Sequence, residues 1–318
     1  MNDSTPTNPV STGLERQGFL LLDGGLATEM ERHGADLEDE LWSARTLLES
    51  PELVQRVHSA FLEAGADIIA TATYQASFEG FRAKGIDHRK GEQLLLLGAE
   101  LAVLARERFW SDYANHRRRL RPLVAASIGP YGAILHDGSE YHGNYDLNRR
   151  ALRDFHRSRL DVLAESDADL LAFETIPSQE EAEILLELLE DYPARQAWLS
   201  YSCRNGAEVS HGEPFSVCAA LADQSPQTVA VGANCTAPGN IAALLESASG
   251  LETPLAAYPN SGEHWNAASQ DWEGEVCGEF PVEEWHAKGA RLIGGCCRTT
   301  TEHIARMRER LLAGITVE

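Results

Sequence analysis

Basic residues are scarce in this sequence. Its 318 residues include 27 lysines and arginines against 49 aspartates and glutamates, which gives a formal net charge of −22 at pH 7. Nucleic acids and anionic membrane surfaces are bound by clusters of lysine and arginine. The composition therefore argues against a nucleic-acid partner and a membrane partner, while the acidic excess favours solubility and specifies no ligand.

Long apolar runs and a secretory signal are also lacking. No stretch reaches the roughly 18 apolar residues of a transmembrane helix, and the polar start MNDSTPTNPVSTG does not have the pattern of a signal peptide. We expect residues 1–18 to form a disordered leader and residues 19–318 to form a single domain. We expect a cytoplasmic protein, in which grouped cysteines are more often metal ligands or catalytic thiols than disulfides.

The sequence does contain a regular series of short apolar runs. Each has a continuous apolar core of about four to six residues, as expected for parallel strands that are covered on both faces. Amphipathic stretches separate them, such as one that begins at Ser178 with acidic residues in its first turn. The eight runs occupy residues 19–25, 66–74, 122–130, 169–177, 197–203, 229–236, 254–260 and 290–297.

Eight strand–helix units predict a (β/α)8 barrel, the TIM barrel, as a single α/β domain. The alternative is an open doubly wound sheet, which usually has a G-x-G-x-x-G phosphate loop after its first strand. The first run instead continues as LLDGGLATEM, which lacks that spacing, so the barrel is favoured.

Two long segments without a helical pattern follow predicted strands, at residues 127–146 and 258–280. Loops that follow the strands of a barrel lie at its carboxyl-terminal mouth, where active sites form. We expect these segments to be lids or substrate walls, although long insertions are also tolerated without a function.

Three of the six cysteines are predicted to lie at this mouth. Cys235 ends one apolar run, and Cys296 and Cys297 end the last. A disulfide between adjacent cysteines is strained. Neighbouring side chains of a strand point to opposite faces, so both can face the mouth only if the strand stops before them, and the preceding glycines permit such a bend.

Three converging thiolates are typical of a tetrahedral Zn²⁺ site whose fourth position is open to a substrate. The alternative is that these cysteines are small buried apolar residues, which is the role we assign to Cys203, Cys218 and Cys277. A zinc ion with three thiolates activates water poorly, but it can hold an incoming thiol as a nucleophilic thiolate. The chemistry indicated is alkyl transfer to sulfur.

Polar groups at other strand ends suit an amino-acid substrate. Asp23 and Glu174 could hold its ammonium group, and the amides of Gly24 and Gly25 could hold its carboxylate. The alternative for the two carboxylates is helix capping at the end of a strand.

The chain resembles the homocysteine S-methyltransferase family, in particular its small stand-alone members that use S-methylmethionine or S-adenosylmethionine. The segments LLDGGLATEM, ADIIATATYQAS, FETIPS, GANC, NSG and GGCCRT carry the resemblance, in this order over residues 19–313. It implies that a zinc-bound homocysteine thiolate attacks the methyl group of the sulfonium donor and forms methionine.

The resemblance also implies roles for single residues. The family's zinc ligands match Cys235, Cys296 and Cys297. Positions that hold the homocysteine backbone match Asp23, Gly24, Gly25 and Glu174, with Asn234 as a supporting residue. Betaine-using relatives have a tyrosine at Thr175, and many relatives have an asparagine at Ala72. We expect no cobalamin or folate module in a chain of this length.

Other functions remain open at this stage. A metal hydrolase would require histidine and carboxylate ligands, which the first strand does not offer. A non-catalytic zinc-binding regulatory protein would require a fourth ligand, for which His264 is a candidate. Selenohomocysteine or another thiol is an alternative acceptor. Aromatic residues near the mouth either pack or face a cationic sulfur, namely Tyr74, Tyr131, Tyr258 and Trp265.

Overall fold

The eight apolar runs form the parallel strands of one barrel. The computed structural model describes residues 8–35, 42–117, 119–266 and 271–314. The strands lie in the order β1-β10-β7-β6-β5-β4-β3-β2, and a bridge between Leu22 and Ile68 joins the two ends of this series. They are β1 (Leu20–Leu21), β2 (Ile68–Ala70), β3 (Leu123–Ile128), β4 (Leu170–Ile176), β5 (Ala197–Tyr201), β6 (Thr228–Asn234), β7 (Leu255–Tyr258) and β10 (Ala290–Ile293). The predicted (β/α)8 barrel is confirmed.

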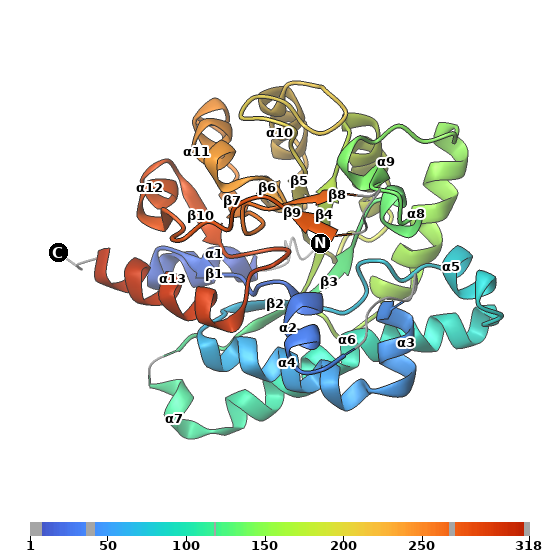
Figure 1. Ribbon diagram of the computed structural model, residues 1–318, viewed down its shortest axis with the longest axis horizontal. Helices are drawn as coiled ribbons and strands as arrows, with labels where there is room; N and C mark the ends of the chain where they lie inside the picture. Colours follow the sequence, from blue (N-terminus) through green and yellow to red (C-terminus); the bar gives the residue numbers. More distant parts are fainter. Residues whose placement is uncertain (1–7, 36–41, 118, 267–270, 315–318) are drawn as a thin grey trace, which may run out of the picture.

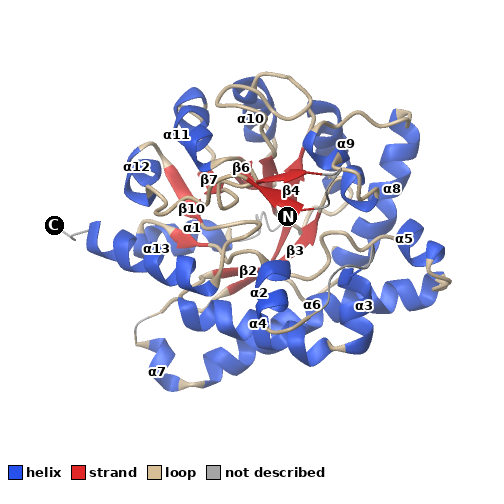
Figure 2. Cartoon of the chain, in the orientation of Figure 1, coloured by secondary structure: helices blue, strands red, loops and turns tan. Residues whose placement is uncertain are grey.

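Helices surround the strands on the outside (Figures 1 and 2). They include α2 (Leu26–Arg32), α3 (Trp42–Glu49), α4 (Pro51–Ala64), α5 (Phe78–Ala83), α6 (His88–Ser111), α7 (Tyr113–His116), α8 (Arg149–Leu163), α9 (Gln179–Leu189), α10 (Phe215–Asp223), α11 (Pro238–Ser247), α12 (Val282–Ala287) and α13 (Thr301–Gly314). Among the helices of the described ranges, none is long and apolar enough to cross a lipid bilayer.

The expected disordered leader is wrong for half of its length, because helix α1 spans Pro9–Gln17. The Asn8 side chain accepts hydrogen bonds from the amides of Val10 and Ser11, and Gly18 ends the helix in a left-handed conformation. Val10 is buried against residues of the barrel interior, which gives the helix a tertiary anchor. We therefore propose one domain that includes α1. Residues 1–7 lie outside the described ranges.

Alternation along the strands separates two apolar cores. In β4, Leu171 and Phe173 belong to the core beneath the helices, whereas Leu170 and Ala172 belong to the core inside the barrel. Trp198 is among the residues that fill the interior. The barrel is thus a packed scaffold, and chemistry is left to the ends of its strands.

The two long segments contain short regular elements that the sequence pattern did not predict. The first includes the 3₁₀ helices η1 (Tyr131–Ile134) and η2 (Ser139–Tyr141). The second includes an antiparallel hairpin of β8 (His264–Asn266) and β9 (Asp271–Glu273). Both follow barrel strands, as expected, and their role as lids or walls stays a prediction.

His58 in α4 makes the stability of the fold sensitive to acid. Its ring is fully buried, neither ring nitrogen has a hydrogen-bond partner among the described residues, and burial lowers its pKa to about 4. The unfolded chain takes up this proton near pH 6.5, so the free energy of unfolding falls as the pH drops toward 4, by about 1.4 kcal/mol per pH unit.

We therefore expect His58→Leu to reduce the acid sensitivity of the fold. Between pH 7 and pH 5 the wild type should lose about 2 kcal/mol more unfolding free energy than the variant, measured by urea denaturation. His88→Leu, at an exposed histidine, is the control and should keep the wild-type slope. Parallel pH profiles for the wild type and His58→Leu would contradict the prediction.

Candidate functional site

Three cysteine sulfurs meet at the carboxyl-terminal mouth of the barrel. Cys235 follows β6, and Cys296 and Cys297 follow β10, which stops before both of them. Their sulfur atoms all lie within 4.8 Å of one another, and those of Cys235 and Cys297 are 3.5 Å apart. Tetrahedral zinc with Zn–S bonds of about 2.3 Å separates its ligand sulfurs by about 3.8 Å, so this donor set fits one zinc ion.

The three thiols differ in their pKa values. Hydrogen bonds with the thiols of Cys296 and Cys297 lower the pKa of Cys235 well below its usual value. The same interactions with Cys235 raise the pKa of Cys296 and of Cys297. The thiols alone therefore favour one thiolate over three, and a divalent cation is the natural partner for the fully ionised set.

The backbone around the thiols adopts conformations that are uncommon for side-chain-bearing residues. Cys235 has φ of 45°, Thr175 has φ of 62° and Arg298 has φ of 63°. Such residues each cost of order 1–3 kcal/mol and concentrate at functional sites. Three of the four such non-glycine residues in the described ranges thus lie at the mouth, so backbone strain is concentrated there.

Close packing explains the two glycines before the paired cysteines. A Cβ atom on Gly294 would lie 2.6 Å from Cβ of Leu22, and one on Gly295 would lie 2.2 Å from Oγ1 of Thr299. Any side chain at either position would push the strand end away from its neighbours. The glycines thus bring the chain close enough to β1 for Cys296 to reach the mouth.

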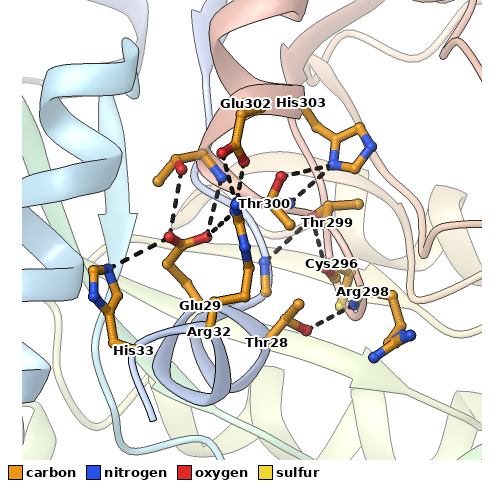
Figure 3. Close-up of polar contacts among 12 residues, drawn as sticks. Thr28, Glu29, Arg32, His33, Cys296, Arg298, Thr299, Thr300, Glu302 and His303 are labelled. Carbon is orange, nitrogen blue, oxygen red and sulfur yellow. Dashed lines mark hydrogen bonds and ion pairs between the residues drawn. The ribbon is translucent and has the colours of Figure 1, made fainter.

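Contacts with the β1–α2 segment hold the cysteine loop in place (Figure 3). The amide of Gly25 donates to the carbonyl oxygen of Thr299 at 3.0 Å. The amide of Arg298 donates to Oγ1 of Thr28 at 3.0 Å, and the Thr299 hydroxyl donates to the carbonyl oxygen of Cys296 at 2.6 Å. Two segments far apart in the sequence therefore form one unit at the site.

A polar cluster behind this loop joins α2 to α13 (Figure 3). The buried carboxylate of Glu29 accepts from the amide of Thr301 at 3.3 Å and pairs with Arg32 at 3.1 Å. Arg32 also donates to Glu302 at 2.7 Å. No sequence signal distinguished this cluster, because the contacts of Glu29 with Thr301 and of Arg32 with Glu302 join the two ends of the chain.

The two glycines expected to hold a substrate carboxylate lie beside the same loop. A Cβ atom on Gly24 would be 2.9 Å from Oγ1 of Thr299, so the backbone approaches closely there. The amide of Gly25 is already donated to Thr299, and a carboxylate would have to replace that hydrogen bond. Carboxylate binding by Gly24 and Gly25 stays a prediction.

Asp23 lies at the end of β1 with its side chain buried. Its Oδ2 accepts a hydrogen bond from the amide of Ala70 at 2.8 Å. Burial raises the pKa of Asp23 well above its usual value, and the nearby Glu174 carboxylate and Cys296 sulfur raise it further. A bound ammonium group would offset this repulsion and favour the ionised carboxylate.

Glu174 at the end of β4 faces the same region. It accepts hydrogen bonds from the hydroxyls of Ser127 and, at 3.3 Å, of Tyr258. Burial raises the pKa of Glu174 to about 7, and the neighbouring Cys296 contributes to this increase. Asp23 and Glu174 thus form a pair of carboxylates beside one of the thiols. A cation bound between them would stabilise the ionised form of both.

Asn234 is fully buried at the end of β6. Its Oδ1 accepts from the amide of Thr175 at 2.7 Å and from the Ser200 hydroxyl at 2.9 Å. Its Nδ2 donates to Oγ1 of Thr175 at 2.7 Å and lies 3.7 Å from the sulfur of Cys296. These contacts suit a residue that supports the cysteine and the strained Thr175, and a direct substrate contact stays a prediction.

Among the aromatic residues expected near the mouth, Tyr258 contacts a site residue, whereas Tyr131 packs against other aromatic rings. The Tyr258 hydroxyl accepts from Nε1 of Trp198 at 2.9 Å and donates to Glu174, so it orients that carboxylate. Tyr131 contacts the rings of Tyr145 and Phe155. The side chains of the remaining hairpin candidates, His264 and Trp265, lie outside the described part of the chain.

Tyr141 is a site residue that the sequence interpretation missed. It ends η2 in the segment after β3, and its hydroxyl oxygen lies 3.3 Å from the sulfur of Cys235. The only available signal was the position of this long segment after a barrel strand, which does not single out one residue. The structure therefore adds a hydroxyl group to the thiol cluster.

Comparisons with known proteins agree with this geometry. A family profile described as homocysteine S-methyltransferase matches residues 20–311. Homocysteine S-methyltransferase of Escherichia coli (strain K12) is 46% identical over 308 residues, which cover 95% of this chain and 98% of the relative. Selenocysteine Se-methyltransferase of Brassica oleracea var. italica is 46% identical over 313 residues, which cover 94% of this chain and 90% of the relative.

A solved structure is also similar over nearly the whole chain. The metallated form of homocysteine methyltransferase MmuM from Escherichia coli is 43% identical, with a TM-score of 0.85, and the match covers 95% of this chain and 100% of that one. Together with the profile match and the two relatives, this similarity shows that the chain belongs to the homocysteine S-methyltransferase family of enzymes.

Proposed function

We propose that the protein is a zinc-dependent enzyme that transfers a methyl group from a sulfonium donor, S-methylmethionine or S-adenosylmethionine, to the thiol of homocysteine. The product is methionine. The observation that carries this proposal is the convergence of the Cys235, Cys296 and Cys297 sulfurs at the barrel mouth. The Escherichia coli relative has been solved in a metallated form, which supports a bound metal in this protein.

Zinc fits the donor set, because three thiolates are common ligands for Zn²⁺ and leave a fourth position open. When bound, the ion would keep the thiol of the acceptor in its thiolate form at neutral pH. The protein's own contribution is to hold the three sulfurs together, through the close packing at Gly295 and the hydrogen bonds of Asn234.

The carboxylate pair of Asp23 and Glu174 binds the ammonium group of homocysteine in this proposal. The two side chains lie beside Cys296, and an ammonium group there would lower the raised pKa of each. The Tyr258 hydroxyl orients Glu174. In this proposal the acceptor sulfur would lie next to the thiols, and the ammonium and carboxylate groups of homocysteine would lie on the side of β1 and β4.

The transfer itself needs alignment and little proton chemistry. The acceptor sulfur forms a bond to the methyl carbon, the bond from that carbon to the donor sulfur breaks, and its electron pair stays on the donor sulfur. The donor becomes a neutral thioether, which is methionine when S-methylmethionine is used. The mouth accelerates such a step by orienting both sulfurs and by excluding water from the thiolate.

A selenium acceptor is the second candidate. The chain is 46% identical to the selenocysteine Se-methyltransferase of Brassica oleracea, so a selenium acceptor belongs among those tested, and selenohomocysteine is the selenium analogue of homocysteine. We also propose a cytoplasmic location, because all six cysteines are unpaired, as is usual in a reducing compartment.

The test is methionine formation by the purified, zinc-loaded protein, with the two sulfonium donors offered separately to homocysteine and to selenohomocysteine. We expect turnover with at least one donor, which would identify it. Stoichiometric zinc without turnover for any pair would contradict the proposal and favour a non-catalytic zinc-binding role or another thiol acceptor.

Tyr141→Phe is expected to weaken zinc binding by about 10-fold, because partners of metal-ligating groups commonly contribute 10- to 100-fold to affinity. The Tyr141 hydroxyl is the neighbour of the Cys235 sulfur at 3.3 Å. Zinc affinity would be measured by competition with a chromophoric chelator. Tyr145→Phe is the matched control, since its hydroxyl binds Glu181 at 3.0 Å and not a thiol. Equal affinity in both variants would show that the Tyr141 hydroxyl does not act on the metal site.

A further inference from the structure

A third carboxylate at the mouth has no role in the transfer proposed above. Glu140 lies in η2, directly before Tyr141, whose hydroxyl lies 3.3 Å from the sulfur of Cys235. The pair of Asp23 and Glu174 lies instead beside Cys296. The thiol cluster therefore has carboxylates at two places.

The position of Glu140 is fixed by its backbone. Its carbonyl oxygen accepts a hydrogen bond from the Ser202 hydroxyl at 3.0 Å. A Cβ atom on Gly132 would lie 2.4 Å from its amide nitrogen, so η1 and η2 pack directly against each other. The carboxylate therefore belongs to a constrained segment and not to a freely moving loop.

One oxygen of this carboxylate is left without a partner. The Oε2 atom of Glu140 is buried and has no hydrogen-bond partner in the described part of the chain. Its charge acts to raise the pKa of Tyr74, Tyr141 and Cys235, in addition to larger effects of burial and hydrogen bonding. All three neighbours are neutral or negative. A buried carboxylate among such groups is unfavourable unless a cation completes the site.

The charges of the two substrates identify that cation. Homocysteine has one cationic group, its ammonium, which the Asp23 and Glu174 pair accounts for. A sulfonium donor has two cationic groups, its own ammonium group and the sulfur itself. Of these two, only the sulfur must lie close to the thiol cluster for the methyl group to be transferred. Carboxylates and aromatic faces are the groups that attract such a cation.

We propose that Glu140, together with the rings of Tyr74 and Tyr141, recognises the positively charged sulfur of the methyl donor. This inference rests on the proposed function. It makes Glu140 a determinant of donor affinity more than of rate. Transfer removes the positive charge, so the carboxylate stabilises the bound donor more than the transition state.

The test compares the donor with its own demethylated product in the zinc-loaded, full-length protein. S-methylmethionine and methionine share the ammonium and carboxylate groups and differ in the methyl group and the charge on sulfur; S-adenosylmethionine and S-adenosylhomocysteine form the equivalent pair. We expect Glu140→Gln to raise the Kd of the donor about 10- to 100-fold, as for the loss of one partner of a buried charge pair. The Kd of the thioether should change less than about 3-fold, and kcat should not fall.

Matched variants make the result specific. Asp146→Asn removes a charge from the same long segment and should leave the donor Kd unchanged, because that side chain is exposed. Glu140→Asp keeps the charge and should weaken donor binding less than Glu140→Gln. If Glu140→Gln does not fold, the shorter Glu140→Asp must still weaken the sulfonium relative to the thioether.

Several outcomes would overturn the inference. Equal losses of affinity for the donor and the thioether would show that the Glu140 carboxylate binds the ammonium group and not the sulfonium. An unchanged donor Kd in Glu140→Gln, with normal methyl transfer by the wild type, would refute the role of Glu140 and leave the proposed function intact. Failure of the wild type to bind either sulfonium would refute both.

Discussion

Cys297→Ala is expected to abolish methyl transfer, with a fall in rate of at least about 1,000-fold, and to remove stoichiometric zinc. The variant leaves two sulfurs of a cluster whose three members lie within 4.8 Å of one another. A site with two thiolates binds zinc less tightly and leaves the acceptor thiol largely protonated. A metal ion supplies several kcal/mol of stabilisation in such sites, and about 4 kcal/mol corresponds to the expected loss.

The other cysteines provide the controls. Cys277→Ala removes a thiol outside the cluster and should keep both zinc and activity. Cys218→Ala removes a buried thiol from the core beneath the helices, so it separates a loss of stability from a loss of the metal. Zinc content would be measured by mass spectrometry, with methionine formation alongside. Full zinc occupancy and turnover in Cys297→Ala would remove the cysteine cluster from the mechanism.

The sequence predicted the elements whose signals are local. The apolar runs marked all eight strands, because buried parallel strands have continuous apolar cores. The place of Cys235 and Cys296 at the ends of two runs predicted that they meet, since the carboxyl ends of barrel strands share one mouth. The sequence also predicted that the two glycines before Cys296 permit a bend. In the structure they also allow the chain to approach β1 closely.

Contacts between distant segments could not be predicted in the same way. The acidic residues that follow Ser178 were interpreted through the helix dipole, yet Glu181 is fully buried and binds the loop after β3. Its carboxylate accepts from the amide of Tyr131 at 2.7 Å and from the Tyr145 hydroxyl at 3.0 Å. This anchor helps to fix the segment that brings Tyr141 to Cys235. Nothing in the local pattern distinguishes such an anchor from an exposed acid in a first turn.

Helix α1 illustrates the same limit at the start of the chain. The polar start of the chain suggested disorder, because the first residues of most domains are poorly ordered. The local signals of a helix were present and were missed, namely Asn8 as a cap, Pro9 in the first turn and Gly18 after the last turn. What the local sequence could not supply is the burial of Val10 against the barrel interior, which gives this short helix its tertiary anchor.

Asp67→Ala is expected to lower the free energy of unfolding by about 3–5 kcal/mol, the range for breaking a buried ion pair from one side. Asp67 is 1% exposed and its carboxylate lies 3.1 Å from Arg308 and 3.4 Å from Arg119. Its Oδ2 also accepts from Gln17 in α1 at 2.8 Å and from the amide of Leu21 in β1 at 3.0 Å. One carboxylate therefore joins both ends of the chain to the barrel.

The control for this prediction is an exposed ion pair. Glu302→Ala removes the partner of Arg32, where both side chains are about half exposed, at 44% and 55%. Such pairs contribute about 1 kcal/mol or less, so this variant should remain close to the wild type. Urea denaturation at neutral pH would measure both. A loss in Asp67→Ala no larger than that in Glu302→Ala would contradict the buried-pair argument.

A double variant separates two causes of the instability expected for Asp67→Ala, the loss of the ion pairs and the repulsion between the two arginines that remain. Desolvation and the nearby charge of Arg308 already lower the pKa of Arg119, so removing the carboxylate leaves two repelling cations in a poorly hydrated place. Arg308→Met removes one of them, and we expect the pair Asp67→Ala/Arg308→Met to be less destabilised than the sum of the single variants. This cluster lies at the amino-terminal ends of the strands, away from the thiols. The folded fraction of Asp67→Ala should therefore bind zinc as the wild type does, which is the reverse of the behaviour expected for Cys297→Ala.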